Sequence, residues 1–185
     1  MEQNKQIYIK SDSRNGREKL ARLAEKGSLE RVERGIYRQA EADISEYESL
    51  FVASLVVPKG VICLLSALRF HDLTTQNPFE IWMAIKPNTH RPKPQSISLR
   101  LVHFSGESFT EGIETHEING ESLRIYNPAK TIADCFKFRH KIGLDTTLEA
   151  LREARRKKLF TMDELWHYAK VCRVTNVIRP YLEAL

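Results

Sequence analysis

Three cysteines and a His-Asp pair are the residues of this sequence whose types could form a nucleophilic or acid–base site. Metal-binding or redox cysteines usually come in C-x-x-C pairs. Cys63, Cys135 and Cys172 are widely spaced, and each lies in an apolar stretch. We interpret them as reduced core residues of a cytosolic protein, with a catalytic thiol as the weaker alternative. His71, next to Asp72, ends an apolar run and is expected to be a structural histidine.

A group of glutamates could suggest a metal-dependent nuclease, which needs clustered carboxylates. They flank a predicted hairpin and have no accompanying lysine motif, so we favour a solvated acidic face; they are Glu111, Glu114, Glu117 and Glu121. The sequence contains no G-x-x-x-x-G-K-[ST] phosphate loop, no G-x-S-x-G nucleophile elbow and no H-E-x-x-H zinc motif. We therefore predict that the protein is not an enzyme and has no catalytic residue, metal or cofactor.

The charged residues are arranged in blocks along the 185 residues, whose net charge is +5. Residues 1–40 carry 10 Lys/Arg against 6 Asp/Glu, residues 86–100 carry 4 against none, and residues 135–185 carry 11 against 6. The two segments between these blocks are acidic. Such a pattern is typical of a protein that binds a polyanion or an acidic protein, and a basic protein without such a partner is the alternative.

The N-terminal block is predicted to form a helix followed by a hairpin. Leu20, Leu23 and Ala24 recur at helical spacing within the basic run 14–26, which predicts a helix there, capped at its start by Ser13 or Asn15 and closed by Gly27. Two short strands then flank Arg34-Gly35, where glycine can take the positive φ of a tight turn.

The rest of the chain predicts an α+β protein of two units. The units are a small N-terminal winged-helix-like unit, residues 1–40, and a mixed α/β domain with a helical C-terminal tail, residues 46–185. Further helices are expected over 46–57, 61–73, 128–139 and 144–158, from Thr161 onward and at the end of the chain, and strands over 80–85, 97–104 and around the type I′ turn Asn119-Gly120. Residues 86–95, with three prolines, should form an exposed loop. No secretory signal and no membrane span are expected.

A basic helix followed by a hairpin is the part of a winged helix that reads DNA, with the helix in the major groove and the hairpin along the backbone. Arg14, Asn15 and Arg17 lie at the helix start, where base-reading residues usually sit. The remaining candidates would contact phosphates from the helix and the hairpin, and they are Lys19, Arg22, Lys26, Arg31, Arg34, Tyr37 and Arg38. The alternative is a solvated basic edge whose charge is partly neutralised by neighbouring glutamates.

Four stretches, in order along the chain, together resemble the AbiEi-family antitoxins of bacterial type IV toxin–antitoxin systems, which are transcriptional regulators. They are LARLAEKGSLERVERGIYR, PKGVICLLSALRFHDLT, EIWMAIKPNTHRP and IYNPAKTIADCFKFRHKIGLDTTLEALREARRKKL, the last running into VCRVTNVIRPYLEAL. The first is similar to the recognition helix and wing of the family, and the second and third to the opening, the strand and the basic loop of its second domain.

The resemblance implies a non-enzymatic, cytoplasmic antitoxin that binds repeats in its own promoter and represses the operon. Its functional partner would be a nucleotidyltransferase-like toxin, with which it forms no stable complex. The second domain would supply antitoxicity and a further positive face toward DNA, drawing here on Lys86, Arg91, Lys93, Arg155, Arg156, Lys157 and Lys158. Two helices usually precede the recognition helix in this family; residues 1–16 are too short for both, so an abbreviated winged helix is expected. A protein-interaction module that docks an acidic protein or the toxin is the runner-up.

Overall fold

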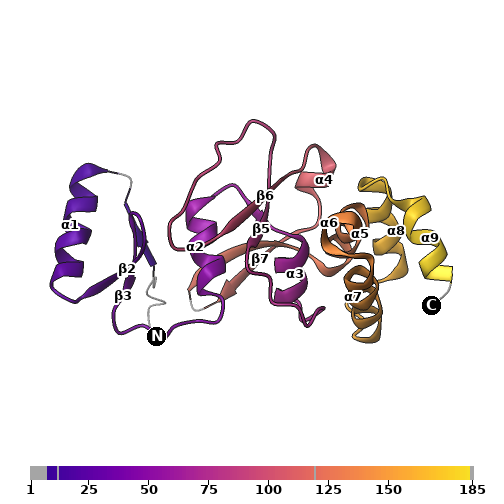
Figure 1. Ribbon diagram of the computed structural model, residues 1–185, viewed down its shortest axis with the longest axis horizontal. Helices are drawn as coiled ribbons and strands as arrows, with labels where there is room; N and C mark the ends of the chain where they lie inside the picture. The colour runs from indigo at the N-terminus through magenta and orange to yellow at the C-terminus, as the bar shows by residue number, and fades with distance from the viewer. Residues whose placement is uncertain (1–7, 12, 119, 184–185) are drawn as a thin grey trace.

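Two sheets, joined by a short acidic linker, organise the chain into an α+β structure (Figure 1). The computed structural model describes residues 8–11, 13–118 and 120–183. The first sheet has three strands and the second has five. The predicted α+β class is therefore confirmed. The predicted turn at Asn119-Gly120 lies partly outside the described residues, and Gly120 itself has φ 81°.

The N-terminal unit consists of one helix and an antiparallel sheet. Its elements are β1 (Tyr8–Lys10), α1 (Arg14–Glu25), β2 (Leu29–Glu33) and β3 (Ile36–Gln39), with strand order β1-β3-β2. Ser13 caps α1 by accepting a hydrogen bond from the Gly16 amide at 3.1 Å. Gly27 and Gly35 have φ values of 76° and 79°, which end the helix and allow the hairpin turn. The predicted helix and hairpin are confirmed.

Side chains on this small sheet alternate between its two faces. Leu29 and Tyr37 pack with Leu20 of α1 on one face. Tyr8 and Ile36 belong to the core of the second domain on the other face. The sheet is therefore a middle layer, with α1 as the outermost layer at one end of the molecule (Figure 1).

In a winged helix, the two helices of a helix-turn-helix precede the hairpin. In the part of the N-terminal unit that the structure describes, residues 8–11 and 13–40, there is one helix, α1, and strand β1 pairs with β3 beside it. An intact winged helix is therefore not confirmed. The described unit corresponds to a helix followed by a hairpin, with a third strand completing the sheet.

The second domain is built on a mixed five-stranded sheet in the order β6-β5-β4-β8-β7. Pairs β5–β6 and β4–β8 are parallel, and pairs β4–β5 and β7–β8 are antiparallel. The strands are β4 (Val61–Ile62), β5 (Ile81–Ile85), β6 (Leu99–His103), β7 (Ile113–Ile118) and β8 (Glu121–Tyr126), and the helices within this part are α2 (Glu48–Val56), α3 (Leu64–Phe70) and α4 (Glu107–Thr110). The strands expected over 80–85 and 97–104 are confirmed, and residues 86–95 form no regular element.

One predicted helix begins later than expected. Val61 and Ile62 form β4, opposite Ala84 and Met83, and only Leu64–Phe70 is helical. Both strand residues are fully buried. An apolar run of this kind cannot be assigned to strand or helix from periodicity alone, and here the pairing partners of β4 decide it.

Five helices form the tail at the far end from α1 (Figure 1): α5 (Pro128–Lys137), α6 (Arg139–Ile142), α7 (Leu144–Arg156), α8 (Met162–Val171) and α9 (Thr175–Glu183). Pro128 occupies the first turn of α5, and Thr161 forms a capping box with Glu164, as predicted. Among the described helices, none combines the length and apolarity needed to cross a membrane.

Candidate nucleic-acid interface

The outer face of α1 carries a continuous stripe of exposed polar and basic side chains. Asn15, Lys19, Arg22 and Lys26 follow one another at spacings of three or four residues, so they lie on one side of the helix. Together with Glu18 and Leu23 they line an open groove along the helix. We call these four residues the α1 stripe. Its three cations form no ion pair with any residue that the structure describes, so their charge faces solvent.

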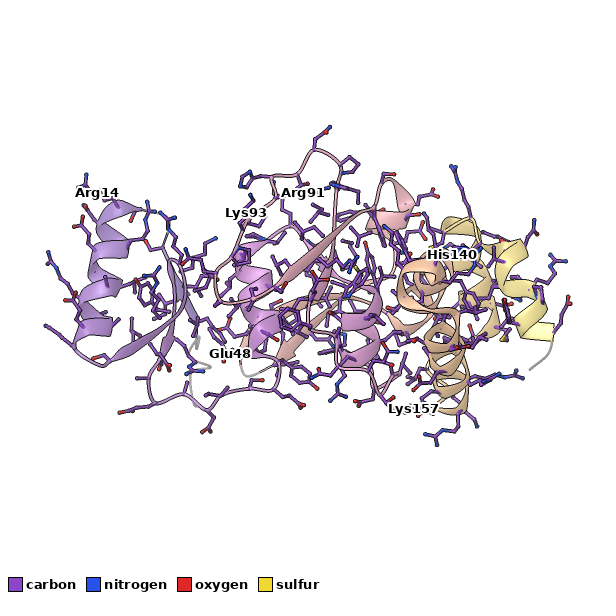
Figure 2. All side chains as sticks on the ribbon, viewed as in Figure 1. Arg14, Glu48, Arg91, Lys93, His140 and Lys157 are labelled. Atoms are coloured by element: carbon purple, nitrogen blue, oxygen red, sulfur yellow. The ribbon has the colours of Figure 1, made fainter. Side chains whose placement is uncertain are left out.

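The two other base-reading candidates lie off this stripe, and at 3.6 residues per turn Arg17 is on the opposite side of the helix from Lys19 and Lys26. Arg14 is exposed and forms an ion pair with Glu18, with Nε and Oε1 3.3 Å apart. Arg17 is exposed as well. Figure 2 shows Arg14 at the outer end of the N-terminal unit, pointing away from the second domain. An exposed ion pair of this kind contributes little to stability, so Arg14 can exchange Glu18 for a phosphate at small cost.

Two hairpin candidates are not on the surface. Tyr37 and Arg38 are 5% and 4% exposed. Tyr37 packs beneath α1, whereas Arg38 points toward the second domain and pairs with Glu30 and with Glu48, the latter at 2.5 Å. The expectation that they face DNA was therefore wrong. They lie on β3, the central strand of the sheet, where both faces are covered.

The hairpin tip, in contrast, is exposed and is attached to the proline-rich loop by Glu33. Arg31 and Arg34 lie on the surface on either side of this buried carboxylate. Glu33 Oε1 accepts a hydrogen bond from the Arg34 amide at 2.7 Å. Its Oε2 accepts from the amides of Gln95 and Ser96, each at 2.8 Å, and from the Ser96 hydroxyl at 2.7 Å. One carboxylate therefore joins two basic segments that are far apart in sequence.

Burial alone would raise the pKa of Glu33, but the hydrogen bonds from Arg34, Ser96 and Gln95 lower it to about 2 from an ordinary value of 4.5. An acid whose pKa falls on folding stabilises the fold above its unfolded pKa. We therefore expect the contribution of Glu33 to be complete above about pH 4.5 and to be lost as the pH falls toward 2.

Replacing Glu33 by alanine should destabilise the protein at pH 7 by about 1–3 kcal/mol, because the amides of residues 95 and 96 lose their acceptor. Urea unfolding between pH 7 and pH 2.5 measures the effect, and the gap between wild type and variant should shrink as the pH falls below 4.5. Glu25→Ala is the matched control, since Glu25 is an exposed glutamate of the same unit. A pH-independent gap would contradict the assignment.

The proline-rich loop carries three cations that were predicted to face DNA. Lys86, Arg91 and Lys93 are exposed, and Figure 2 shows Arg91 and Lys93 on the loop above the second sheet. Arg91 contacts the ring of His103 through Nη2 and Nε2. Lys86 Nζ lies 5.4 Å from the centre of the Phe109 ring. The structure thus joins the end of this loop to the hairpin tip through Glu33, whereas Arg91 and Lys86 contact residues of the second domain.

The last four candidates lie elsewhere. Arg155, Arg156, Lys157 and Lys158 are at the end of α7, in the helical tail, and Figure 2 shows Lys157 at the opposite end of the molecule from Arg14. Arg156 pairs with Glu153 at 2.6 Å, and Lys157 Nζ donates to the Asp72 carbonyl oxygen at 2.8 Å. These four residues do not share a face with the α1 stripe.

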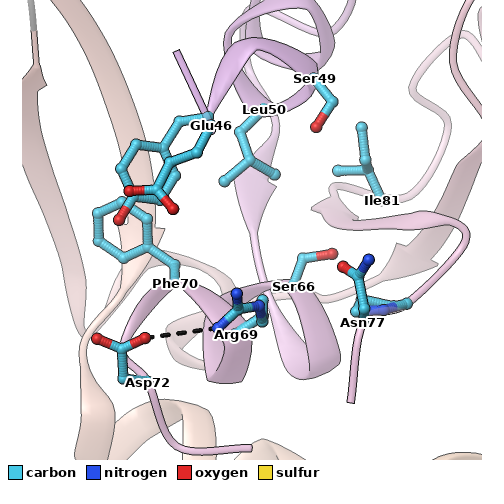
Figure 3. Close-up of a pocket in the computed structure, with 11 residues that line it drawn as sticks. Glu46, Ser49, Leu50, Ser66, Arg69, Phe70, Asp72, Asn77 and Ile81 are labelled. Atoms are coloured by element: carbon cyan, nitrogen blue, oxygen red, sulfur yellow. Dashed lines mark ion pairs between the residues drawn. The ribbon is translucent and has the colours of Figure 1, made fainter. Parts of the chain in front are cut away.

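A second concavity lies between the start of α2, the end of α3 and residues 77–81 (Figure 3). It measures about 290 Å³, and Leu50, Phe70 and Ile81 supply apolar surface within it. Its charged pair, Arg69 and Asp72, lies 3.6 Å apart near the surface. The hydroxyl of Ser66 in its lining already accepts the Trp82 amide hydrogen bond at 2.9 Å. The pocket is therefore better suited to packing against an apolar group than to nucleophilic chemistry.

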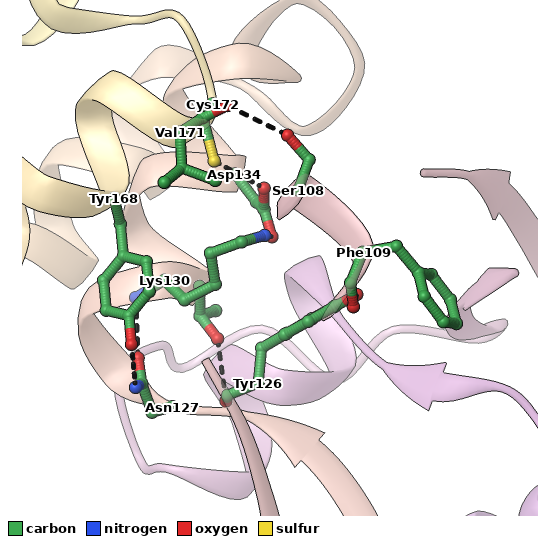
Figure 4. A network of polar contacts seen from close by, with 10 residues as sticks. Ser108, Phe109, Tyr126, Asn127, Lys130, Asp134, Tyr168, Val171 and Cys172 are labelled. Atoms are coloured by element: carbon green, nitrogen blue, oxygen red, sulfur yellow. Dashed lines mark hydrogen bonds and ion pairs between the residues drawn. The ribbon is translucent and has the colours of Figure 1, made fainter. Parts of the chain in front are cut away.

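The buried polar network of the tail is structural (Figure 4). Lys130 Nζ lies 2.6 Å from Asp134 Oδ2, and both side chains are inaccessible to solvent. The Cys172 thiol donates to Asp134 Oδ1 at 3.1 Å. Burial raises the pKa values of all three thiols, those of Cys63 and Cys135 well above the ordinary value. The cysteines are free and buried, as predicted, and their protonated thiols are poor nucleophiles.

The other residues considered for catalysis also have structural partners. His71 Nε2 lies 2.9 Å from the Tyr126 carbonyl oxygen, to which it can donate. Glu111 Oε2 pairs with His167 at 2.6 Å. Glu121 is buried and accepts a hydrogen bond from the Tyr8 amide at 2.9 Å, so its assignment to a solvated face was wrong. No group of three potential metal ligands occurs among the residues that the structure describes.

Glu33 is a functional residue of this surface that the sequence analysis missed. From the sequence it was interpreted only as one of the glutamates that partly neutralise the basic residues around it. Its role depends on Gln95 and Ser96, which no local pattern connects to the hairpin. Comparison with protein-family models and with curated proteins finds no match for this chain.

Proposed function

We propose that the protein is a DNA-binding transcriptional regulator, an antitoxin similar to the AbiEi family, that represses its own operon in the cytoplasm. The α1 stripe carries this proposal. It presents an amide and three cations along one exposed helix face, on the outermost layer of the molecule. A helix of this width fits the major groove, where arginine and asparagine read base edges and lysine neutralises phosphates.

The hairpin and the loop would supply backbone contacts beside the helix, in the manner of a wing. Arg31 and Arg34 are exposed on the hairpin, Arg91 and Lys93 are exposed on the loop, and Glu33 fixes the hairpin tip against residues 95 and 96. Each phosphate that such a cation neutralises makes the logarithm of the binding constant fall by about 0.9 per logarithmic unit of salt. The AbiEi resemblance adds a nucleotidyltransferase-like toxin as the functional partner and direct or inverted promoter repeats as the operator.

A mobility-shift titration of the protein on the DNA upstream of its own gene, against a random duplex of equal length, tests the proposal. Binding to the upstream DNA should be about 1,000-fold tighter or more, and it should weaken as salt is raised. Equal, weak binding to both duplexes would show that the protein binds DNA only non-specifically, and it would contradict the proposal that the protein is a transcriptional regulator.

A protein-interaction module is the second candidate function. Phe79 and Ile44 are 92% and 68% exposed, and each lies within two residues of the lining of the pocket in Figure 3. Exposed apolar side chains near a pocket are typical of protein interfaces. In this case the cations would dock an acidic protein partner, and no binding to any duplex would be observed in the same titration.

A further inference from the structure

A basic pocket in the helical tail lies outside the surface proposed for DNA. It measures about 680 Å³ and is formed by the segment that leads into α4, the end of α5 and the end of α8. Its cations come from three places in the sequence: Lys137 ends α5, Lys170 lies in the last turn of α8, and Arg173 follows α8. The remaining lining residues are Ser105, Gly106, Glu107, Ser108, His167 and Val171.

The positive charges of this pocket exceed the negative charges of its lining. Lys137, Lys170 and Arg173 are exposed, and none of them forms an ion pair inside the described part of the chain. His167 is already paired with Glu111. Glu107 is the carboxylate in the lining, so the pocket keeps an excess of two positive charges.

The pocket is held in shape by the fold. The Ser108 hydroxyl donates to the Val171 carbonyl oxygen at 3.0 Å, which ties α4 to the end of α8 (Figure 4). Beneath it lies the buried network of Lys130, Asp134 and Cys172. Two walls of the pocket are therefore fixed to one another and to the core.

The backbone at Arg173 has a conformation that residues with a side chain rarely adopt. Its φ is 60°, in the left-handed region. It follows the C-cap of α8, where the Val174 amide donates back to the Ala169 carbonyl oxygen at 2.8 Å. Glycine is the usual residue at this point of a helix end, because it takes a positive φ without strain. An arginine here disfavours the fold slightly while adding a cation to the pocket.

We propose that this pocket binds the phosphate group of a small phosphorylated molecule. A dianionic phosphate matches the excess of two positive charges, and guanidinium and ammonium groups are its usual ligands. The volume is larger than a free phosphate needs and is in the range of small-molecule sites, so a phosphate ester with a polar body fits best. This site is independent of the proposed DNA interface.

Isothermal titration of the full chain with pyrophosphate, inorganic phosphate and adenosine monophosphate tests the proposal. At least one of the three should bind with a dissociation constant below about 1 mM. Binding of the monophosphate alone would identify an ester as the source of the phosphate, whereas equal binding of inorganic phosphate would identify the free ion. The absence of heat with all three probes at millimolar concentration would overturn the proposal.

Arg173→Gly and Lys158→Gly form a matched pair for this test. Lys158 has φ 55° after α7, so glycine relieves the same backbone strain there and removes the same charge outside the pocket. Arg173→Gly should fold at least as stably as wild type and bind the probe at least 10-fold more weakly, while Lys158→Gly keeps wild-type affinity. Equal weakening in both variants would show a general charge effect and overturn the site. The site would also be overturned if Arg173→Gly lost duplex binding but bound the probe as wild type does.

Discussion

Replacing Lys19, Arg22 and Lys26 together by alanine should weaken binding to the protein's upstream DNA on the order of 100-fold. All three cations are exposed on one face of α1 and are not paired with described residues. If each neutralises a phosphate, the slope of log affinity against log salt should become shallower by about 3. Alanine is the best helix former, so α1 should remain intact. Fluorescence anisotropy at several salt concentrations measures both quantities.

The matched control removes the same charge from the other end of the molecule. Arg152, Arg155 and Lys158 are exposed on or just after α7, and the described residues offer them no ion pair. Replacing these three by alanine should change affinity less than threefold. If this control instead reproduces the loss and the α1 variant does not, the interface lies on the tail, and the assignment to the α1 stripe is wrong.

The second large effect is expected on stability. Asp134→Ala should destabilise the protein by about 3–5 kcal/mol, because it leaves the Lys130 ammonium buried without its carboxylate. Lys130 Nζ also lies over the Tyr126 ring at 4.2 Å and the Phe104 ring at 4.9 Å, so it cannot turn to solvent without disrupting the core. Urea unfolding followed by circular dichroism measures the loss.

The double variant Lys130→Met/Asp134→Leu distinguishes the contribution of the ion pair to stability from that of the packing around it. An apolar pair of similar volume needs no counter-charge, so most of the stability lost in Asp134→Ala should return. A double variant that is as unstable as the single one would mean that packing of the aspartate itself, rather than charge pairing, stabilises this part of the core.

Local signals predicted the elements of the fold well. The spacing of Leu20, Leu23 and Ala24 places α1, and Gly27 ends it. Pro128 and Thr161 mark helix starts that the structure confirms. Each of these signals depends on residues that are three or four positions apart, so it can be recognised from a short stretch of sequence alone.

Errors arose where a residue depends on a distant partner. Arg38 is buried because Glu48 and Glu30 lie opposite it, and Glu121 is buried because it accepts the Tyr8 amide. The link between Glu33 and residues 95 and 96 likewise depends on how the two units pack. Charge alone cannot distinguish a buried, paired arginine from a surface arginine, and this is why Arg38 was wrongly placed in the interface. Tyr37 was wrongly placed because its packing against α1 is also a contact between separate elements.

Site-specific photo-crosslinking tests the proposed DNA interface most directly. A photoreactive amino acid would replace Arg22 on the α1 stripe in one sample and Arg155 on α7 in another, each mixed with labelled upstream duplex. We predict a protein–DNA crosslink from position 22 that excess unlabelled upstream DNA suppresses and random DNA does not, with none from position 155. Stable duplex binding with a crosslink from position 155 and none from position 22 would contradict the assignment of DNA recognition to α1.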